Sequence, residues 1–290
     1  MKHYTSPVTQ TAEAAQAVEA PVDALAPAGT RFLLTIQYLG TQYAGWQTQT
    51  NAVGVQQVIE KVLEMRFGKP LTLQSAGRTD SGVHACAHRA HVDIPSAVTR
   101  RSLVLGLNNA LPRDIRITEA EPVPGNFHAR FDAISKRYRY QILNDSVANV
   151  FLAATHLHVA QELDVDVMSR AARDLVGLHD FRSFTVAAPE VSSTVRNLSE
   201  LHIEKSDRRI TIDVTADGFL RYMVRRIAGL LIEIGRGKLP ETALADALGP
   251  KFQEARWTAA AHGLTLEEVI YDRDESAYLR PLQGTRRNPD

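Results

Sequence analysis

The order of its patterned segments constrains the fold of this sequence more than any other feature. Alternating and β-branched runs predict strands at 31–40, 71–76, 89–94 and 114–123, and apolar residues at helical spacing predict helices at 53–67 and 100–111. The first half of the chain therefore runs strand, helix, strand, strand, helix, strand. A sheet with helices packed on one face, the ferredoxin-like α+β arrangement, accommodates this order.

A similar order follows Gly125, although no sequence repeat is evident between the two halves. Strands are predicted at 134–144, 195–205, 208–216 and 264–272, helices at 164–177 and 219–238, and a shorter helix after Pro240. The prediction is two ferredoxin-like (RRM-like) halves with mainly antiparallel sheets. We divide the chain into a disordered tail at 1–29, an N-terminal domain at 30–125, a C-terminal domain at 126–279 and a flexible tail at 280–290.

The composition is that of a globular protein outside the membrane. Of the 290 residues, 44% are hydrophobic and 23% charged, and no run of about 18 apolar residues suggests a membrane span. Cys86 is the single cysteine, so no intrachain disulfide can form, which agrees with a cytoplasmic location. The 33 basic and 33 acidic residues cancel, which argues against indiscriminate coating of nucleic acid. Segments 135–141 and 219–229 are nevertheless basic enough to line a groove.

The stretch SAGRTDSGVHACAHRAH at 75–91 gathers the residues best suited to chemistry. One interpretation is a metal site with His91 close by, because His84, Cys86 and His88 would share one face of a strand and three ligands plus water suit catalytic zinc. Against it, the chain has no second ligand cluster, and the glutamate that base deaminases carry beside a zinc-bound histidine is absent after His84. Satisfied or exposed histidines are the better account.

The same stretch offers a phosphate cradle or a single carboxylate instead. Gly77 and Gly82 fit neither the Walker spacing nor a G-x-G-x-x-G motif, so a cradle is weakly supported. What remains is Arg78 and Asp80, which lie two residues apart on a bend that the glycines allow. Asp80 either carries the chemistry or caps the turn beside a solvated Arg78, and for an arbitrary Arg-x-Asp the capping role is commoner.

Five ordered blocks of the sequence resemble the TruA family of tRNA pseudouridine synthases. They read IQYLGTQYAGWQTQ, AGRTDSGVHA, FHARFDAISKRYRY, DGFLRYMVRRIAG and AAHGLTLEEVIYD, and the similarity runs from about Arg31 to Tyr271. The resemblance implies an enzyme that detaches a uracil from its ribose at N1, rotates it and rejoins it through C5, in a cleft between the two halves. It also implies that neither a metal nor a redox cofactor takes part.

The resemblance assigns roles to three side chains. Asp80 becomes the essential carboxylate, and an unperturbed pKa of about 4 leaves it ionised at neutral pH. Arg78 becomes its partner until RNA enters, and Tyr138 becomes the ring that lies against the target base. Without the resemblance, Tyr138 would be a core aromatic. Whether Asp80 attacks C1′ of the ribose, attacks C6 of the base or removes a proton at C2′ stays open.

The helix predicted at 219–238 divides into an apolar face and a face with three arginines. Arg221, Arg225 and Arg236 fall within about 60° of one another, opposite the apolar side chains. Such a stripe is most often a solvated surface, but the resemblance implies that Arg221 lies near the catalytic carboxylate and that this surface binds RNA phosphates. Leu264, which alone looks like core, is implied to line the pocket for an extruded uridine.

The implied partners are tRNA and a second copy of the chain. The family modifies uridines thirty-eight to forty of the anticodon arm as homodimers, and Gly77 and Gly82 belong to the loop that would receive the RNA. The sequence departs from the family pattern at 87–89, Thr185 and Ala260, and different contacts are expected there. A catalytically silent RNA-binding or folding-assistance protein on the same scaffold is the alternative from another class.

Overall fold

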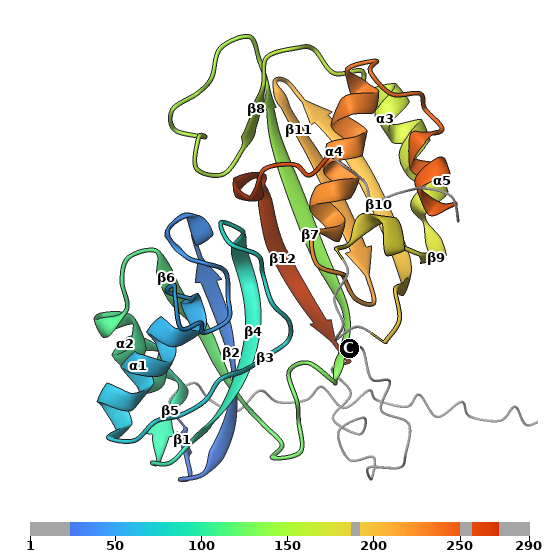
Figure 1. The fold of residues 1–290 in the computed structure, drawn as a ribbon. Helices are drawn as coiled ribbons and strands as arrows, with labels where there is room; N and C mark the ends of the chain where they lie inside the picture. The colour runs from blue at the N-terminus through green and yellow to red at the C-terminus, as the bar shows by residue number, and fades with distance from the viewer. Residues whose placement is uncertain (1–23, 187–191, 250–256, 273–290) are drawn as a thin grey trace, which may run out of the picture.

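The computed structural model describes residues 24–186, 192–249 and 257–272, which form an α+β fold (Figure 1). The first half of the chain supplies the strands β1 (Leu25–Ala26), β2 (Thr30–Tyr38), β3 (Gln74–Ser75), β4 (His84–Ile94), β5 (Val98–Thr99) and β6 (Ile115–Val123). Its helices are η1 (Gly40–Gln42, a 3-10 turn), α1 (Val55–Phe67) and α2 (Arg100–Ala110). The predicted order of elements is confirmed, although the strand predicted at 71–76 shrinks to 2 residues.

The second half supplies the strands β7 (Ala133–Asn144), β8 (Leu157–Val159), β9 (Gly177–Asp180), β10 (Val195–Ser206), β11 (Arg209–Ala216) and β12 (Leu264–Tyr271). Its helices are α3 (Val165–Ala172), α4 (Met223–Gly235) and α5 (Ala243–Leu248), with the 3-10 turns η2 (Arg173–Leu175), η3 (Arg182–Phe184) and η4 (Ala261–Gly263). The helix predicted to begin at Phe219 begins at Met223 instead, because Tyr222 has a left-handed backbone with a φ of 66°.

One continuous sheet runs through both halves (Figure 1). Its strand order is β6-β2-β4-β12-β7-β11-β10-β9, with β3 beside β4 and β8 beside β7. Among the described strands of this sheet, β12 with β4 and β7 with β8 pair in parallel, and the other neighbours pair antiparallel. The predicted α+β class with a mainly antiparallel sheet is therefore confirmed.

A bulge in β4 shifts the side-chain alternation of this strand. Ile36 of β2 pairs with His88 of β4, but Tyr38 pairs with Ala85, so β4 carries one more residue than β2 over this interval. Alternation along β2 puts Ile36 and Tyr38 on one face, and their partners share that face. His88 and Ala85 therefore point to the same face of the sheet, although residues three apart point to opposite faces in a regular strand.

The helices of both halves pack on this same face of the sheet. Ala85 pairs with Leu266 of β12, and Leu266 pairs with Tyr138 of β7, so the face continues across the middle of the sheet. These side chains belong to one hydrophobic cluster with the buried residues of α1, α2, α3, α4 and α5. The predicted placement of the helices on one face is confirmed.

Helix α1 confirms the helix predicted at 53–67. Its buried side chains recur at helical spacing, at Val55, Ile59, Val62 and Leu63. The helix ends where Gly68 adopts a left-handed φ of 70° and its N–H donates to the carbonyl of Glu64.

The last strand of the described chain, β12, joins the two halves. It lies between β4 and β7 (Figure 1) and pairs Thr265 with His84 in parallel. We retain a domain boundary near Gly125 as a proposal, with the sheet running unbroken across it.

The predicted tails fall mostly outside the described residues. Positions 1–23 and 280–290 lie there, whereas Leu25–Ala26 form β1 and pair with β5. No helix in the described ranges combines the length and the apolar character needed to cross a membrane.

Gly40 brings the backbone after β2 into contact with the loop 76–83. An ideal Cβ on Gly40 would lie 1.9 Å from the carbonyl oxygen of Val83 and 2.6 Å from its carbonyl carbon. The N–H of Gly40 also donates to Nδ1 of His84 at 2.9 Å. Any side chain at Gly40 would push this loop away from β2.

We expect Gly40→Ala to lower the free energy of unfolding by about 1–3 kcal/mol, because backbone atoms must move to admit the methyl group. Gly125→Ala is the matched control, since nothing lies within 4 Å of its Cβ position. The control should change stability by less than about 0.5 kcal/mol. Urea unfolding followed by circular dichroism measures both variants, and equal stability would contradict the proposed contact.

Candidate active site

The loop 76–83 is held by the segment that follows β2. The hydroxyls of Tyr38 and Thr79 share a hydrogen bond of 2.8 Å, and the N–H of Trp46 donates to the carbonyl of Thr79 at 3.1 Å. Gly45 permits this approach, because its φ is 93° and a Cβ there would lie 2.4 Å from the same carbonyl oxygen. The backbone of the loop is therefore fixed by the fold itself.

Asp80 extends from this loop into a partly buried position. Its side chain is 22% exposed, and Oδ2 lies 3.7 Å from Nη1 of Arg225. Burial raises the pKa of the Asp80 carboxyl, and the positive charges of Arg225 and Arg221 oppose that rise. The ionised form of Asp80 therefore depends on these arginines in place of the water that burial removes.

Arg221 and Arg225 meet at the ring of Tyr222. Their guanidinium carbons lie 4.9 Å and 5.1 Å from the ring centroid. The Nε of Arg225 donates to the carbonyl of Ala259 at 2.8 Å, which orients the guanidinium toward Asp80. Arg221 is exposed, and its guanidinium donates to the Tyr222 hydroxyl at 3.1 Å.

The predicted stripe of arginines along one helix is wrong. Because α4 begins at Met223, Arg221 lies before the helix and has no helical phase with Arg225. Arg236 lies at the opposite end of α4 and forms an ion pair with Glu233. Arg221 and Arg225 are brought together by the Tyr222 turn.

Tyr138 lies on β7, close enough to Asp80 to be influenced by its charge. The tyrosine is 8% exposed, and its ring packs edge-on against Phe219 with centroids 5.0 Å apart. Burial and the charge of Asp80 both raise the pKa of its hydroxyl, which therefore stays protonated at neutral pH. Leu264 is buried on β12 opposite Tyr140, two residues along β7 from Tyr138.

Arg78 and Gly82 share the loop with Asp80. Among the described residues, the ion pair of Asp80 is with Arg225, and Arg78 is exposed. The partnership of Arg78 with Asp80 stays a prediction. Gly82 has a φ of 80°, and a Cβ there would lie 3.1 Å from Cβ of Ala261, so the bend favours glycine.

The three histidines of the stretch are buried. The bulge in β4 turns His84 and His88 to opposite faces, so the expectation that they share a face is wrong. Nε2 of His84 lies 2.9 Å from the carbonyl oxygen of Ala154 and 3.0 Å from that of His262. His88 is fully buried with its ring centroid 3.9 Å from that of Trp46. No group of three or more metal-ligating side chains occurs in the described ranges.

The departures from the family pattern occupy packed positions. Nη1 of Arg89 lies 3.9 Å from the carboxylates of two glutamates on β6. Thr185 is buried, and its carbonyl accepts a hydrogen bond of 2.6 Å from Arg226. The carbonyl of Ala260 accepts one of 2.8 Å from the Tyr140 hydroxyl. Each of these three positions therefore makes a contact within the fold.

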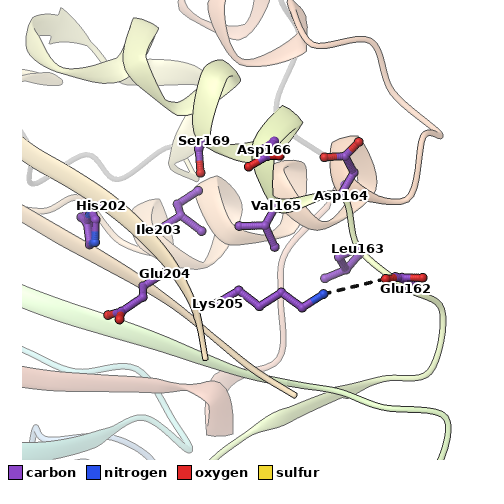
Figure 2. Close-up of a pocket in the computed structure, with 11 residues that line it drawn as sticks. Glu162, Leu163, Asp164, Val165, Asp166, Ser169, His202, Ile203, Glu204 and Lys205 are labelled. Carbon is purple, nitrogen blue, oxygen red and sulfur yellow. Dashed lines mark ion pairs between the residues drawn. The ribbon is translucent and has the colours of Figure 1, made fainter. Parts of the chain in front are cut away.

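A groove of about 960 Å³ lies away from Asp80, between α3 and β10 (Figure 2). Its acidic lining residues are Glu162, Asp164, Asp166 and Glu204. The lysine of the groove, Lys205, is paired with Glu162 at 3.8 Å. An acidic lining repels a polyanion, so this groove is unsuited to nucleic acid.

The fold and the candidate site define a class of protein: an α+β protein with one partly buried carboxylate beside arginines and a tyrosine ring. Arginines suit phosphates and an aromatic ring suits a planar base, so the class is one that acts on nucleic acid. The chain belongs to the tRNA pseudouridine synthase family, whose model matches residues 34–132 and 171–272.

Three relatives illustrate the similarity, and each is a tRNA pseudouridine synthase A. That of Hydrogenovibrio crunogenus is 38% identical over 243 residues, covering 83% of this chain and 93% of the relative. That of Syntrophotalea carbinolica is 41% identical over 239 residues, covering 82% and 95%. That of Ruminiclostridium cellulolyticum is 42% identical over 240 residues, covering 82% and 98%.

One solved structure is a much weaker match. A chain from the crystal structure of a Cbf5-Nop10-Gar1 complex is 13% identical, with a TM-score of 0.29 over 69% of this chain and 45% of that chain. This likeness is too weak to bear on fold or function.

Two aromatic residues of the site were missed at the level of sequence. The ring of Tyr222 contacts the guanidiniums of Arg221 and Arg225. The ring of Phe219 packs against that of Tyr138. The available signal was the interleaving of aromatic and basic residues in FLRYMVRR, which is typical of nucleic-acid sites. The apolar residues of the same stretch recur at helical spacing, which predicts a helix through Tyr222 and not a turn there.

We expect Arg225→Gln to shift the acid limb of the kcat/KM profile for pseudouridine formation to higher pH. Loss of the positive charge beside Asp80 leaves burial less opposed, so the pKa of the carboxyl rises and more of it is protonated at a given pH. Arg236→Gln is the control, since Arg236 lies at the far end of α4. An acid limb that stays in place in Arg225→Gln would show that this carboxyl does not set it.

Proposed function

We propose that the protein converts uridine to pseudouridine in the anticodon arm of tRNA, at positions thirty-eight to forty, with Asp80 as the catalytic carboxylate. Membership of the family supports the reaction and the substrate. The observation that carries the role of Asp80 is its position, partly buried, 3.7 Å from Arg225 and close to Tyr138. Arg78 acts with Asp80 from the same loop.

The reaction exchanges one glycosidic bond for another within a single nucleotide. The N1–C1′ bond breaks, the base rotates, and a C5–C1′ bond forms. C5 loses its proton and N1 gains one, so the overall change is an isomerisation. Asp80 takes part as an attacking oxygen at C1′ or C6, or as a base at C2′, and each role requires the ionised carboxylate.

The target uridine must leave its stack before Asp80 can reach it. The ring of Tyr138 provides a surface for the extruded base, and Leu264 contributes to the apolar wall behind it. Arg221 and Arg225 bind phosphates of the RNA backbone. Such contacts release counterions, so the affinity for tRNA falls as the salt concentration rises.

A homodimer in the cytoplasm is also part of the proposal, as the resemblance implies. The loop before β8 exposes large apolar side chains that suit a subunit contact, with exposed fractions of 71% at Val147, 80% at Val150 and 92% at Phe151. The solution mass of the purified protein tests the dimer directly.

We expect Asp80→Asn to abolish pseudouridine formation while retaining tRNA binding, because asparagine has nearly the same size but no charge. The formation of pseudouridine in a tRNA transcript is measured by chemical mapping, and binding is measured by filter retention. Asp207→Asn is the matched control, because Asp207 is exposed in the β10–β11 turn with a φ of 54°, which asparagine tolerates.

Substantial activity in Asp80→Asn would refute the role of this carboxylate. A protein that binds tRNA but forms no pseudouridine even as wild type would instead support the catalytically silent alternative.

A further inference from the structure

Lys136 lies on β7 two residues before Tyr138, so the two side chains share a face of the sheet. Its side chain lies beside Gly77 of the loop 76–83, with Cε 3.5 Å and Nζ 3.8 Å from where a Cβ on Gly77 would be. The end of the Lys136 side chain therefore lies against the loop that carries Asp80.

No hydrogen bond or ion pair joins this ammonium to another residue within the described ranges. Burial first, and then the charges of Arg130 and Arg196, lower its pKa to about 8. Asp217 acts in the opposite direction, but its Oδ1 accepts a hydrogen bond of 3.0 Å from the N–H of Asn197. Lys136 is therefore a partly dehydrated cation that is mostly charged at neutral pH, and no carboxylate of the described residues forms an ion pair with it.

A desolvated charge without a partner is costly to the folded state, and such groups concentrate at functional sites. The base of a uridine is neutral, so the anion that an RNA substrate brings to this position is a phosphate. A lysine ammonium binds phosphate as a point charge and needs no second donor.

We propose that Lys136 binds a phosphodiester next to the extruded uridine and so positions the nucleotide at Asp80. This inference rests on the proposed function, because it takes the RNA as the substrate of the same site. Arg221 and Arg225 reach Asp80 from the Tyr222 turn, whereas Lys136 reaches the loop at Gly77. The arginine pair and Lys136 therefore provide positive charge at two separate positions, one for each of the two phosphates that flank a nucleotide.

The test is a binding cycle between Lys136→Met and single methylphosphonate linkages in a synthetic anticodon stem-loop. Methionine preserves most of the length and removes the charge, and a methylphosphonate removes the charge of one phosphate. We expect Lys136→Met to weaken binding about tenfold and to reduce the salt slope by about 1. At one linkage beside the target uridine, the methylphosphonate should weaken binding to the parent protein but not to Lys136→Met.

Lys205→Met is the matched control, because Lys205 lies in the acidic groove of Figure 2 and is paired with Glu162. It should bind the stem-loop as the parent does. Lys136→Arg restores the positive charge and should recover most of the affinity.

The inference is overturned if every methylphosphonate weakens Lys136→Met as much as it weakens the parent. Replacing a structural ammonium would lower the unfolding temperature. We expect an equal or higher temperature, because the buried charge forms no ion pair with the residues that the structure describes. All binding is compared in the Asp80→Asn background, where no chemistry occurs. A wild-type protein that forms no pseudouridine would therefore contradict the proposed function, but the binding comparison would still test the role of Lys136.

Discussion

The site depends on two places where backbone touches backbone and no side chain fits. Gly40 lies against the carbonyl group of Val83, and Gly45 lies against the carbonyl oxygen of Thr79. These contacts hold both ends of the turn that carries Asp80 against the segment after β2. The position of the carboxylate is therefore set by the fold of the first half, before any substrate binds.

Burial acts on two oppositely charged groups of this region, Asp80 and Lys136, with opposite effects on their pKa values. Burial raises the pKa of the Asp80 carboxyl and lowers that of the Lys136 ammonium, so it disfavours the charged form of each. The ion pair with Arg225 partly compensates Asp80. Lys136 has no ion-pair partner among the described residues, and the charge of Asp217 only partly offsets its burial. Buried charges that are only partly compensated lower the stability of the folded state, and such groups are common at functional sites.

Local patterns predicted the elements that local contacts determine. Helix α1 was predictable because its buried side chains recur at helical spacing and Gly68 ends it. The face of His84 was not, since a bulge depends on how β4 pairs with β2, a long-range contact. The start of α4 at Met223 was also not predictable, because the periodicity of apolar residues does not indicate the left-handed backbone of Tyr222.

Some residues of the candidate site were predictable from the sequence, and others depend on long-range contacts. Asp80 and Tyr138 were identified through resemblance, and the structure brings them near each other. The identity of the arginine that contacts Asp80 could not be read from sequence spacing. Arg225, which comes from the other half of the chain, lies within ion-pair distance of Asp80 among the described residues.

The central place of β12 has a consequence for the newly made chain. The residues of this strand are synthesised after all the other described strands and helices, yet they lie between β4 and β7 in the sheet. Until they emerge from the ribosome, each half presents an unpaired strand edge, and Asp80 has no fixed relation to Tyr138. An incomplete chain that still lacks β12 therefore cannot assemble the candidate site while it is being synthesised on the ribosome.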